Sequence, residues 1–108
     1  MKLLTDKIIE ALPSLYSTED IPCDEKVVIV KFFNPLGNQT WEITEGSIQE
    51  DGDWLFFGKC DLGFGCAEWG YVSLRELESI DAGFGLGIER DICSGEAYYH
   101  PEWKEHYA

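Results

Sequence analysis

The sequence is poor in positive charge. It contains 8 Lys and Arg residues against 21 Asp and Glu residues, which gives a formal net charge of −13. Proteins that bind nucleic acid directly need a basic patch that neutralises phosphates. The sequence offers no such patch, so direct nucleic-acid binding is excluded as the expected function.

Long apolar runs are also missing. The chain has 108 residues, and none of its apolar runs approaches the length that spans a bilayer. Near the start, Asp6, Lys7 and Glu10 interrupt the apolar residues that a signal peptide would need. We therefore expect a cytoplasmic protein with no membrane partner, folded as a single domain over residues 1–108.

Cysteines are few, and none of them forms a closely spaced pair. The four are Cys23, Cys60, Cys66 and Cys93. In a cytoplasmic protein such cysteines are expected to be thiols rather than disulfides. Zinc ligands are usually paired as C-x2-C, whereas "CDLGFGC" separates its cysteines more widely. We predict no bound metal and no cofactor.

Motifs of common catalytic sites are absent as well. His100 and His106 are not the i, i+4 pair of a zinc protease. "GFGLGIE" lacks the spacing of the dinucleotide-binding fingerprint. Glu50 with Asp53 means little as an acid–base pair in a chain so rich in carboxylates. We therefore expect a protein without enzymatic activity.

What the sequence does contain is a succession of helical and β-like patterns. "TDKIIEAL" has an N-cap at Thr5 and an apolar stripe, and Pro13 should end this helix near Leu12. "SLRELESI" opens with a capping box of Ser73 and Glu76. Strand patterns cover residues 26–33, 39–46, 54–62, 69–73 and 88–92, and residues 81–87 are expected to be a loop. The prediction is α+β: an antiparallel β-meander of about five strands, in which residues 26–33 form a buried central strand, with an N-terminal helix and one short helix packed on one face.

The stretch "LPSLYSTEDIP", which begins at residue 12, has a proline near each end and is expected to be an ordered connector. Leu15 and Tyr16 are predicted to pack on the core as anchors. Ser17 or Thr18 is predicted to cap a single helical turn. Glu19 and Asp20 would then face outward at the positive end of that turn.

Five sequence blocks stand in order along the chain: "LPSLYSTEDIP", "VVIVKFFNP", "EDGDWLFFG", "EWGYVSLRELESI" and "GLGIERD". Together they resemble the small bacterial proteins grouped as domain of unknown function 2958, over residues 2–92. The resemblance implies a protein encoded on plasmids, conjugative elements or prophages, and it implies no particular activity. Cys60, Cys66 and the tail after Asp91 depart from the family's pattern.

One segment of the chain has acids but no base. Between Lys31 and Lys59 the acids are Glu42, Glu45, Glu50, Asp51 and Asp53. Alternation along a predicted hairpin makes these side chains mostly exposed. Two interpretations are open: a solvated hairpin that aids solubility, or a negative face that meets a basic partner.

A second group of candidates places polar residues beside aromatic ones. Its members are Tyr16, Glu19, Asp20, Glu68, Trp69, Tyr71 and Arg90. Structural interpretations exist for each, for example an ion pair of Arg90 with Glu68 or Asp20. The sharper hypothesis is a shared recognition face, since the residues fall in expected loops and strand ends.

Two functional hypotheses follow. The first is a small acidic, non-enzymatic interaction protein of mobile-element type. It would bind a basic, nucleic-acid-binding protein of host defence or element transfer, with carboxylates in place of phosphates. The alternative is a small-ligand-binding or hydrolytic domain with a pocket near Tyr16–Asp20 and Trp69–Tyr71. The salt dependence of binding distinguishes the two hypotheses, because only charge-driven binding weakens steeply with ionic strength.

Overall fold

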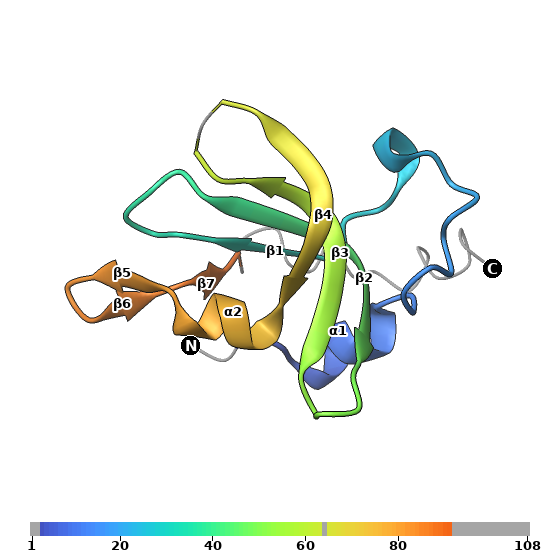
Figure 1. The fold of residues 1–108 in the computed structure, drawn as a ribbon, viewed down its shortest axis with the longest axis horizontal. Helices are drawn as coiled ribbons and strands as arrows, with labels where there is room; N and C mark the ends of the chain where they lie inside the picture. The colour runs from blue at the N-terminus through green and yellow to red at the C-terminus, as the bar shows by residue number, and fades with distance from the viewer. Residues whose placement is uncertain (1–2, 64, 92–108) are drawn as a thin grey trace.

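The computed structural model describes residues 3–63 and 65–91 of the chain, and its centre is a five-stranded sheet in the order β4-β3-β2-β1-β7. The strands are β1 (Val30–Phe33), β2 (Thr40–Ile48), β3 (Trp54–Asp61), β4 (Ala67–Ser73) and β7 (Glu89–Arg90). All neighbouring strands are antiparallel, and β1 to β4 follow one another as a meander (Figure 1). The predicted α+β meander is confirmed.

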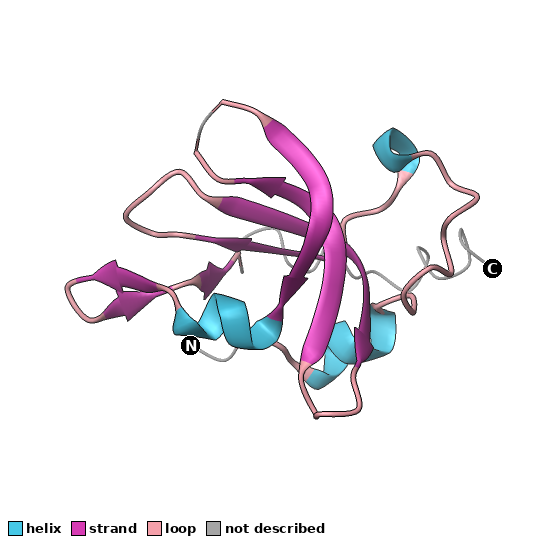
Figure 2. Ribbon diagram, in the orientation of Figure 1, coloured by secondary structure: helices cyan, strands magenta, loops and turns pink. Residues whose placement is uncertain are grey.

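Two short helices, α1 (Asp6–Ala11) and α2 (Leu74–Ser79), begin at the caps that the sequence predicts (Figure 2). The Thr5 hydroxyl accepts a hydrogen bond from the Ile8 amide at 3.3 Å. Ser73 and Glu76 form a complete capping box. Leu12 is already extended, because the residue before a proline avoids helical geometry. No helix in the described parts of the chain is long and apolar enough to cross a membrane.

One face of the sheet, which we call the inner face, packs against both helices. Its buried side chains are Val30, Phe32, Trp41, Ile43, Phe56 and Val72. Ile8 and Ala11 of α1 and Leu77 of α2 join the same apolar cluster. Burying an aliphatic or aromatic side chain of this size contributes about 1.5–3 kcal/mol. The helices therefore pack on one face of the sheet, as predicted.

Strands β2 and β3 make a close approach and then a β-bulge. A Cβ on Gly58 would lie 2.1 Å from the Glu42 carbonyl oxygen, so only glycine fits there. The pairing then passes from Ile43 opposite Gly58 directly to Glu45 opposite Phe57. The residue between them, Thr44, is the unpaired residue of the bulge. Ile43 and Glu45 consequently lie on opposite faces, although simple alternation would put them on the same one.

Two of the expected strands are much shorter than predicted. Residues 26–29 were predicted to be part of a central strand, but β1 begins only at Val30 and the middle strand of the sheet is β2. They follow a single 3-10 turn, η1 (Cys23–Glu25), and still add one hydrogen bond, from the Ile29 amide to the Ile43 carbonyl at 2.8 Å. The last strand was predicted over residues 88–92, whereas β7 has two residues and residue 92 lies outside the described part.

The expected loop at residues 81–87 is instead a hairpin. It consists of β5 (Asp81–Gly83) and β6 (Leu86–Gly87). Phe84 and Gly85 form its tip, and both have positive φ, as a two-residue type I′ turn requires. The glycines that favoured a loop in the sequence supply this turn geometry.

Candidate functional site: an aromatic outer face anchored by a buried ion pair

The face of the sheet opposite the helices, the outer face, carries the candidate site. Beyond the bulge, Glu45 of β2, Phe57 of β3 and Tyr71 of β4 form one cross-strand row. Lys59 and Trp69 are paired in the next row. Residues in such rows lie about 5 Å apart and interact directly. The bulge is therefore what brings a carboxylate beside aromatic rings.

Four aromatic rings gather on this face, and we call them the aromatic cluster: Tyr16, Phe57, Trp69 and Tyr71. Phe57 is central, with its ring centroid 5.2 Å from that of Tyr71 and 5.7 Å from that of Trp69. The Tyr16 ring reaches in from the connector, 6.4 Å from Tyr71. These separations are typical of interacting aromatic pairs. Since Tyr16 and Tyr71 are 58% and 51% exposed, the cluster presents aromatic surface to solvent.

Tyr16 is held in an unfavourable backbone conformation. Its φ is 69°, which costs a non-glycine residue about 1 kcal/mol or more. Its amide donates to Glu45 Oε1 at 2.9 Å, and the Leu15 amide donates to Ser47 Oγ at 2.9 Å. The prediction that Tyr16 packs on the core is wrong, because these bonds fix the connector to β2 and leave the ring on the outer face.

Glu45 anchors the connector and is itself buried, with 3% of its surface exposed. Its carboxylate lies 3.5 Å from Lys26 Nζ, and both side chains are 4% exposed. The Thr18 hydroxyl donates to Glu45, and Lys26 donates to Thr18. The prediction that Glu45 is exposed is wrong, because the connector and Lys26 cover its carboxylate on the outer face, where the bulge places it. The predicted cap is wrong too: Thr18 binds Glu45, and the Ser17 hydroxyl donates back to the Ser14 carbonyl.

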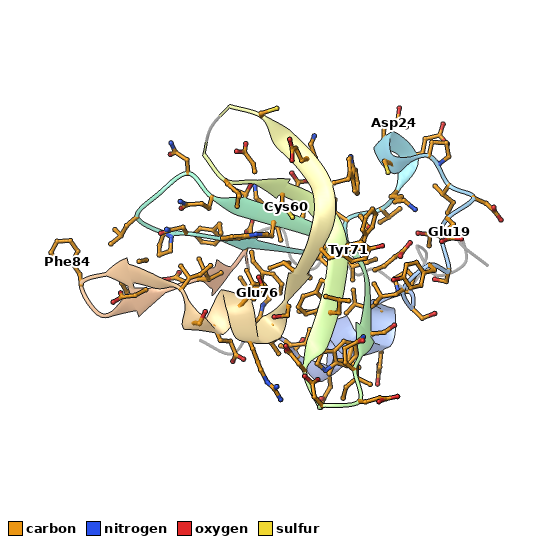
Figure 3. All side chains as sticks on the ribbon, in the orientation of Figure 1. Glu19, Asp24, Cys60, Tyr71, Glu76 and Phe84 are labelled. Atoms are coloured by element: carbon orange, nitrogen blue, oxygen red, sulfur yellow. The ribbon has the colours of Figure 1, made fainter. Side chains whose placement is uncertain are left out.

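The surroundings of Tyr71 in the aromatic cluster raise the pKa of its hydroxyl. Hydrogen bonding with the Tyr16 side chain raises the pKa of Tyr71 most, and desolvation and the carboxylates of Glu45 and Glu19 raise it further. Tyr71 therefore stays neutral at physiological pH. Figure 3 shows the labelled Tyr71 on the side of the sheet toward the connector segment that carries Glu19.

The acids of residues 42–53 do not form one face. Glu42 is half-buried and is paired with Lys31 of β1 on one side and Lys59 of β3 on the other. Opposite charges that face each other across strands stabilise a sheet modestly. The charge of Glu42 is therefore partly neutralised by Lys31 and Lys59, and the charge of Glu45 is neutralised by its buried ion pair with Lys26.

The other three acids of this segment lie at the β2–β3 turn. Glu50 and Asp51 are exposed, and Asp53 is half-buried. Arg75 of α2 contacts two of them: its guanidinium lies 3.4 Å from the Asp51 carboxylate, and its amide donates to Asp53 at 3.1 Å. These acids are at the turn, apart from the rows of the aromatic cluster.

The remaining candidates divide between two edges of the sheet. Glu19 and Asp20 are exposed in the turn that follows Tyr16, and Glu68 is exposed beside Trp69 on β4. Arg90 lies on β7, the opposite edge from β4, and its guanidinium donates to the Leu3 carbonyl at 3.4 Å. Of the predicted recognition residues, Tyr16, Trp69 and Tyr71 come together on the outer face. Glu68 pairs with Cys60 and so belongs to the opposite face of β4, and Arg90 lies on another edge.

A cavity of about 290 Å³ lies along β4, lined by Cys60, Leu62, Cys66, Glu68, Trp69, Gly70 and Tyr71. It shares two rings with the aromatic cluster but includes no residue of the connector, so this pocket is placed differently from the predicted one. Burial raises the pKa of the Cys60 thiol, which keeps it protonated and weakly nucleophilic. Within residues 3–63 and 65–91, no group of three metal-ligating side chains is close enough to hold a metal ion. Cys93, His100 and His106 lie outside those residues.

Sequence reasoning missed three residues. Phe57 had a usable signal, because one of the two adjacent phenylalanines in "WLFF" has to face outward from a strand. Lys26 had no local signal, since its partner is far along the chain. Phe84 is 97% exposed at the tip of the β5–β6 hairpin (Figure 3), where the glycine-rich pattern indicated only a loop.

The family model described as "Protein of unknown function (DUF2958)" matches residues 3–104. The chain therefore belongs to this family, in agreement with the resemblance of its sequence blocks. No curated protein and no solved structure matches the chain. A function for this protein has to be argued from the outer face itself.

Proposed function

We propose that the protein is a small acidic, non-enzymatic binding module that recognises a basic protein surface through the outer face of its sheet. The observation that carries this proposal is Tyr16, an exposed aromatic residue kept at positive φ by a buried carboxylate. Strained backbone persists only where the surrounding structure enforces it, and it clusters at binding sites. Glu45 and Lys26 are the groups that enforce it here.

The chemistry of the outer face suits cationic side chains. Arginine and lysine bind over the faces of tryptophan and tyrosine rings, as in Trp69 and Tyr71. Glu19 acts electrostatically on Tyr71, so a carboxylate accompanies the rings of the outer face, whereas Glu68 points to the opposite face of β4. The net charge of −13 adds long-range attraction for a basic partner.

The partner class that we propose is a nucleic-acid-binding protein of host defence or of element transfer. Such proteins expose basic surfaces that otherwise hold phosphates, and carboxylates can occupy the same positions. The resemblance to proteins of mobile elements supports this class.

Affinity capture from a bacterial lysate, at low and at high salt, tests the proposal. The protein should retain a basic partner at low salt and release it at high salt. The double substitution Tyr16→Ala, Tyr71→Ala should abolish capture. Phe84→Ala is the matched control, because it removes an exposed ring remote from the cluster and should leave capture unchanged. Capture that ignores salt, or survives loss of both tyrosines, contradicts the proposal.

A second candidate function is binding of a small ligand, which is favoured by the cavity of about 290 Å³ with Trp69 in its wall. A fragment screen by ligand-observed NMR measures it. Trp69→Ala should then remove binding, whereas Tyr16→Ala should retain it, because Tyr16 does not line this cavity. The salt response should be weak.

A further inference from the structure

Strand β4 is an open edge of the sheet. It pairs only with β3, and its seven residues do so without a register break, from Ser73 opposite Leu55 to Ala67 opposite Asp61. Among the described residues, no loop or turn forms a backbone hydrogen bond with β4. The other edge of the sheet, β7, is only two residues long. The long edge therefore offers a row of backbone donors and acceptors on its outward side.

The sequence of β4 carries only one of the usual protections of an edge, the charge of Glu68. Natural sheets discourage further pairing with lysine, proline or a bulge on their edge strands. "AEWGYVS" has no lysine and no proline, its ladder is regular, and its single charge is Glu68. That carboxylate, on a chain with net charge −13, repels a second acidic copy and attracts a basic strand.

The surroundings of β4 have space and binding groups for an added strand. A Cβ on Gly70, in the middle of the strand, would meet nothing within 4 Å. The cavity of about 290 Å³ opens beside it, with Glu68 in its wall. On the outer face Trp69 and Tyr71 are two residues apart, which is the spacing of side chains on one face of a strand. Alternate side chains of an added strand would lie beside these two rings.

We propose that β4 receives an extended basic segment of the partner as an additional strand. Main-chain hydrogen bonds to β4 give the affinity, and arginine or lysine side chains over Trp69 and Tyr71 give the selectivity. This inference rests on the proposed function for the charge of the partner, and it adds the mode of binding.

Three synthetic peptides of equal length test this mode by fluorescence anisotropy with the full chain. The first alternates arginine with threonine or valine, the second has glutamate in place of arginine, and the third is the first with every second amide N-methylated. The arginine peptide should bind, and the glutamate peptide should not. N-methylation should weaken binding by about tenfold or more, because it removes main-chain donors and blocks strand pairing without changing charge.

The outcomes separate the two proposals. If the methylated and unmethylated arginine peptides bind equally, strand addition is wrong while recognition of a basic partner stands. If neither binds at low salt, the proposed function itself is overturned. If light scattering shows a dimer that Glu68→Lys alters, the occupant of the edge is a second copy and the inference is wrong.

Substitutions at Gly70 and amide exchange locate the binding. Gly70→Lys and Gly70→Glu fill the same open space with opposite charges, so only the lysine variant should lose the arginine peptide. Hydrogen exchange should show alternate β4 amides unprotected in the free protein and protected with the arginine peptide bound. Amides that are all protected before peptide is added would show that the edge is already covered, and would overturn the inference.

Discussion

Tyr16 and Phe84 share one backbone feature and differ in everything around it. They are the two non-glycine residues with positive φ in the described parts of the chain, at 69° and 56°. Tyr16 is held by Glu45, 29 residues away in sequence, and its ring contacts Tyr71. Phe84 is 97% exposed and is flanked by Gly83 and Gly85. The same strain is thus maintained by tertiary contacts in one place and by local glycine geometry in the other.

The comparison shows when a positive φ at a non-glycine residue points to a functional site. A strained residue between glycines follows from the turn alone. A strained residue fixed by a buried ion pair requires Glu45, Lys26 and the bulge at Thr44 to be in place together. Breaking those supports should therefore affect Tyr16 and leave Phe84 unchanged.

The largest effect is expected from Glu45→Leu. It leaves the buried Lys26 ammonium without an opposite charge, and the free energy of unfolding should fall by about 3–5 kcal/mol. Urea denaturation measures this. The double substitution Glu45→Leu, Lys26→Met should recover much of the loss, since no charge is then stranded. Glu50→Gln at the exposed turn is the control and should change stability by less than about 0.5 kcal/mol. A loss below about 1 kcal/mol for Glu45→Leu would show that the pair is not buried.

A smaller effect should separate glycine from alanine at the two strained positions. Tyr16→Gly should be more stable than Tyr16→Ala by about 1 kcal/mol, because glycine adopts positive φ freely while both variants lose the ring. Phe84→Gly and Phe84→Ala should show a similar difference. Thermal unfolding of the four variants measures both gaps. Equal stability of the two Tyr16 variants would mean that the connector relaxes to negative φ.

Phe84→Asn should raise stability slightly, by about 0.5 kcal/mol. Asparagine is preferred at the first position of a type I′ turn, and the exposed ring has almost no contacts to lose. Phe84→Val is the matched control and should be destabilising, since a β-branched residue tolerates positive φ poorly. A destabilised asparagine variant would reveal a packing role for the ring.

The smallest effect is spectroscopic. The pKa of Tyr71 is raised in the folded protein, first by hydrogen bonding with Tyr16. A raised folded pKa means that the folded state holds this proton more tightly than the unfolded chain. The associated stability is complete below the ordinary tyrosine pKa of about 10 and is lost as pH rises through the raised value. Tyr16→Phe should lower the Tyr71 pKa in an ultraviolet titration. A Tyr71 pKa equal to that of the unsubstituted protein would exclude coupling between the two hydroxyls.

The parts of the fold that depend on local pattern were predictable. Ser73 and Glu76 satisfy each other within one turn, and the alternation of Trp41 and Ile43 suffices to define a strand and its inner face. The α+β meander follows because short links join strands of this kind.

The site was predictable only in part, because its decisive contacts are remote. The candidate rings Tyr16, Trp69 and Tyr71 do come together. The burial of Glu45, however, depends on a bulge and on a lysine 19 residues earlier in the chain, in the pair Lys26–Glu45. Neither the bulge nor the pairing of Lys26 with Glu45 produces a hydrophobic pattern that can be recognised in the sequence. Alternation read without the bulge assigns every residue after Thr44 to the wrong face.

The bulge has a consequence for comparing chains of this family. Thr44 has no partner across the ladder, so every pair before Ile43 and after Glu45 would keep its register if that residue were missing. A relative that is one residue shorter at this point can therefore build the same sheet and present the same outer face. A one-residue gap elsewhere in β2 would turn the rest of the strand over. Alignments should accordingly place any single-residue gap of this strand at Thr44. A gap there shifts the residue numbers by one but leaves each later side chain on the same face of the sheet.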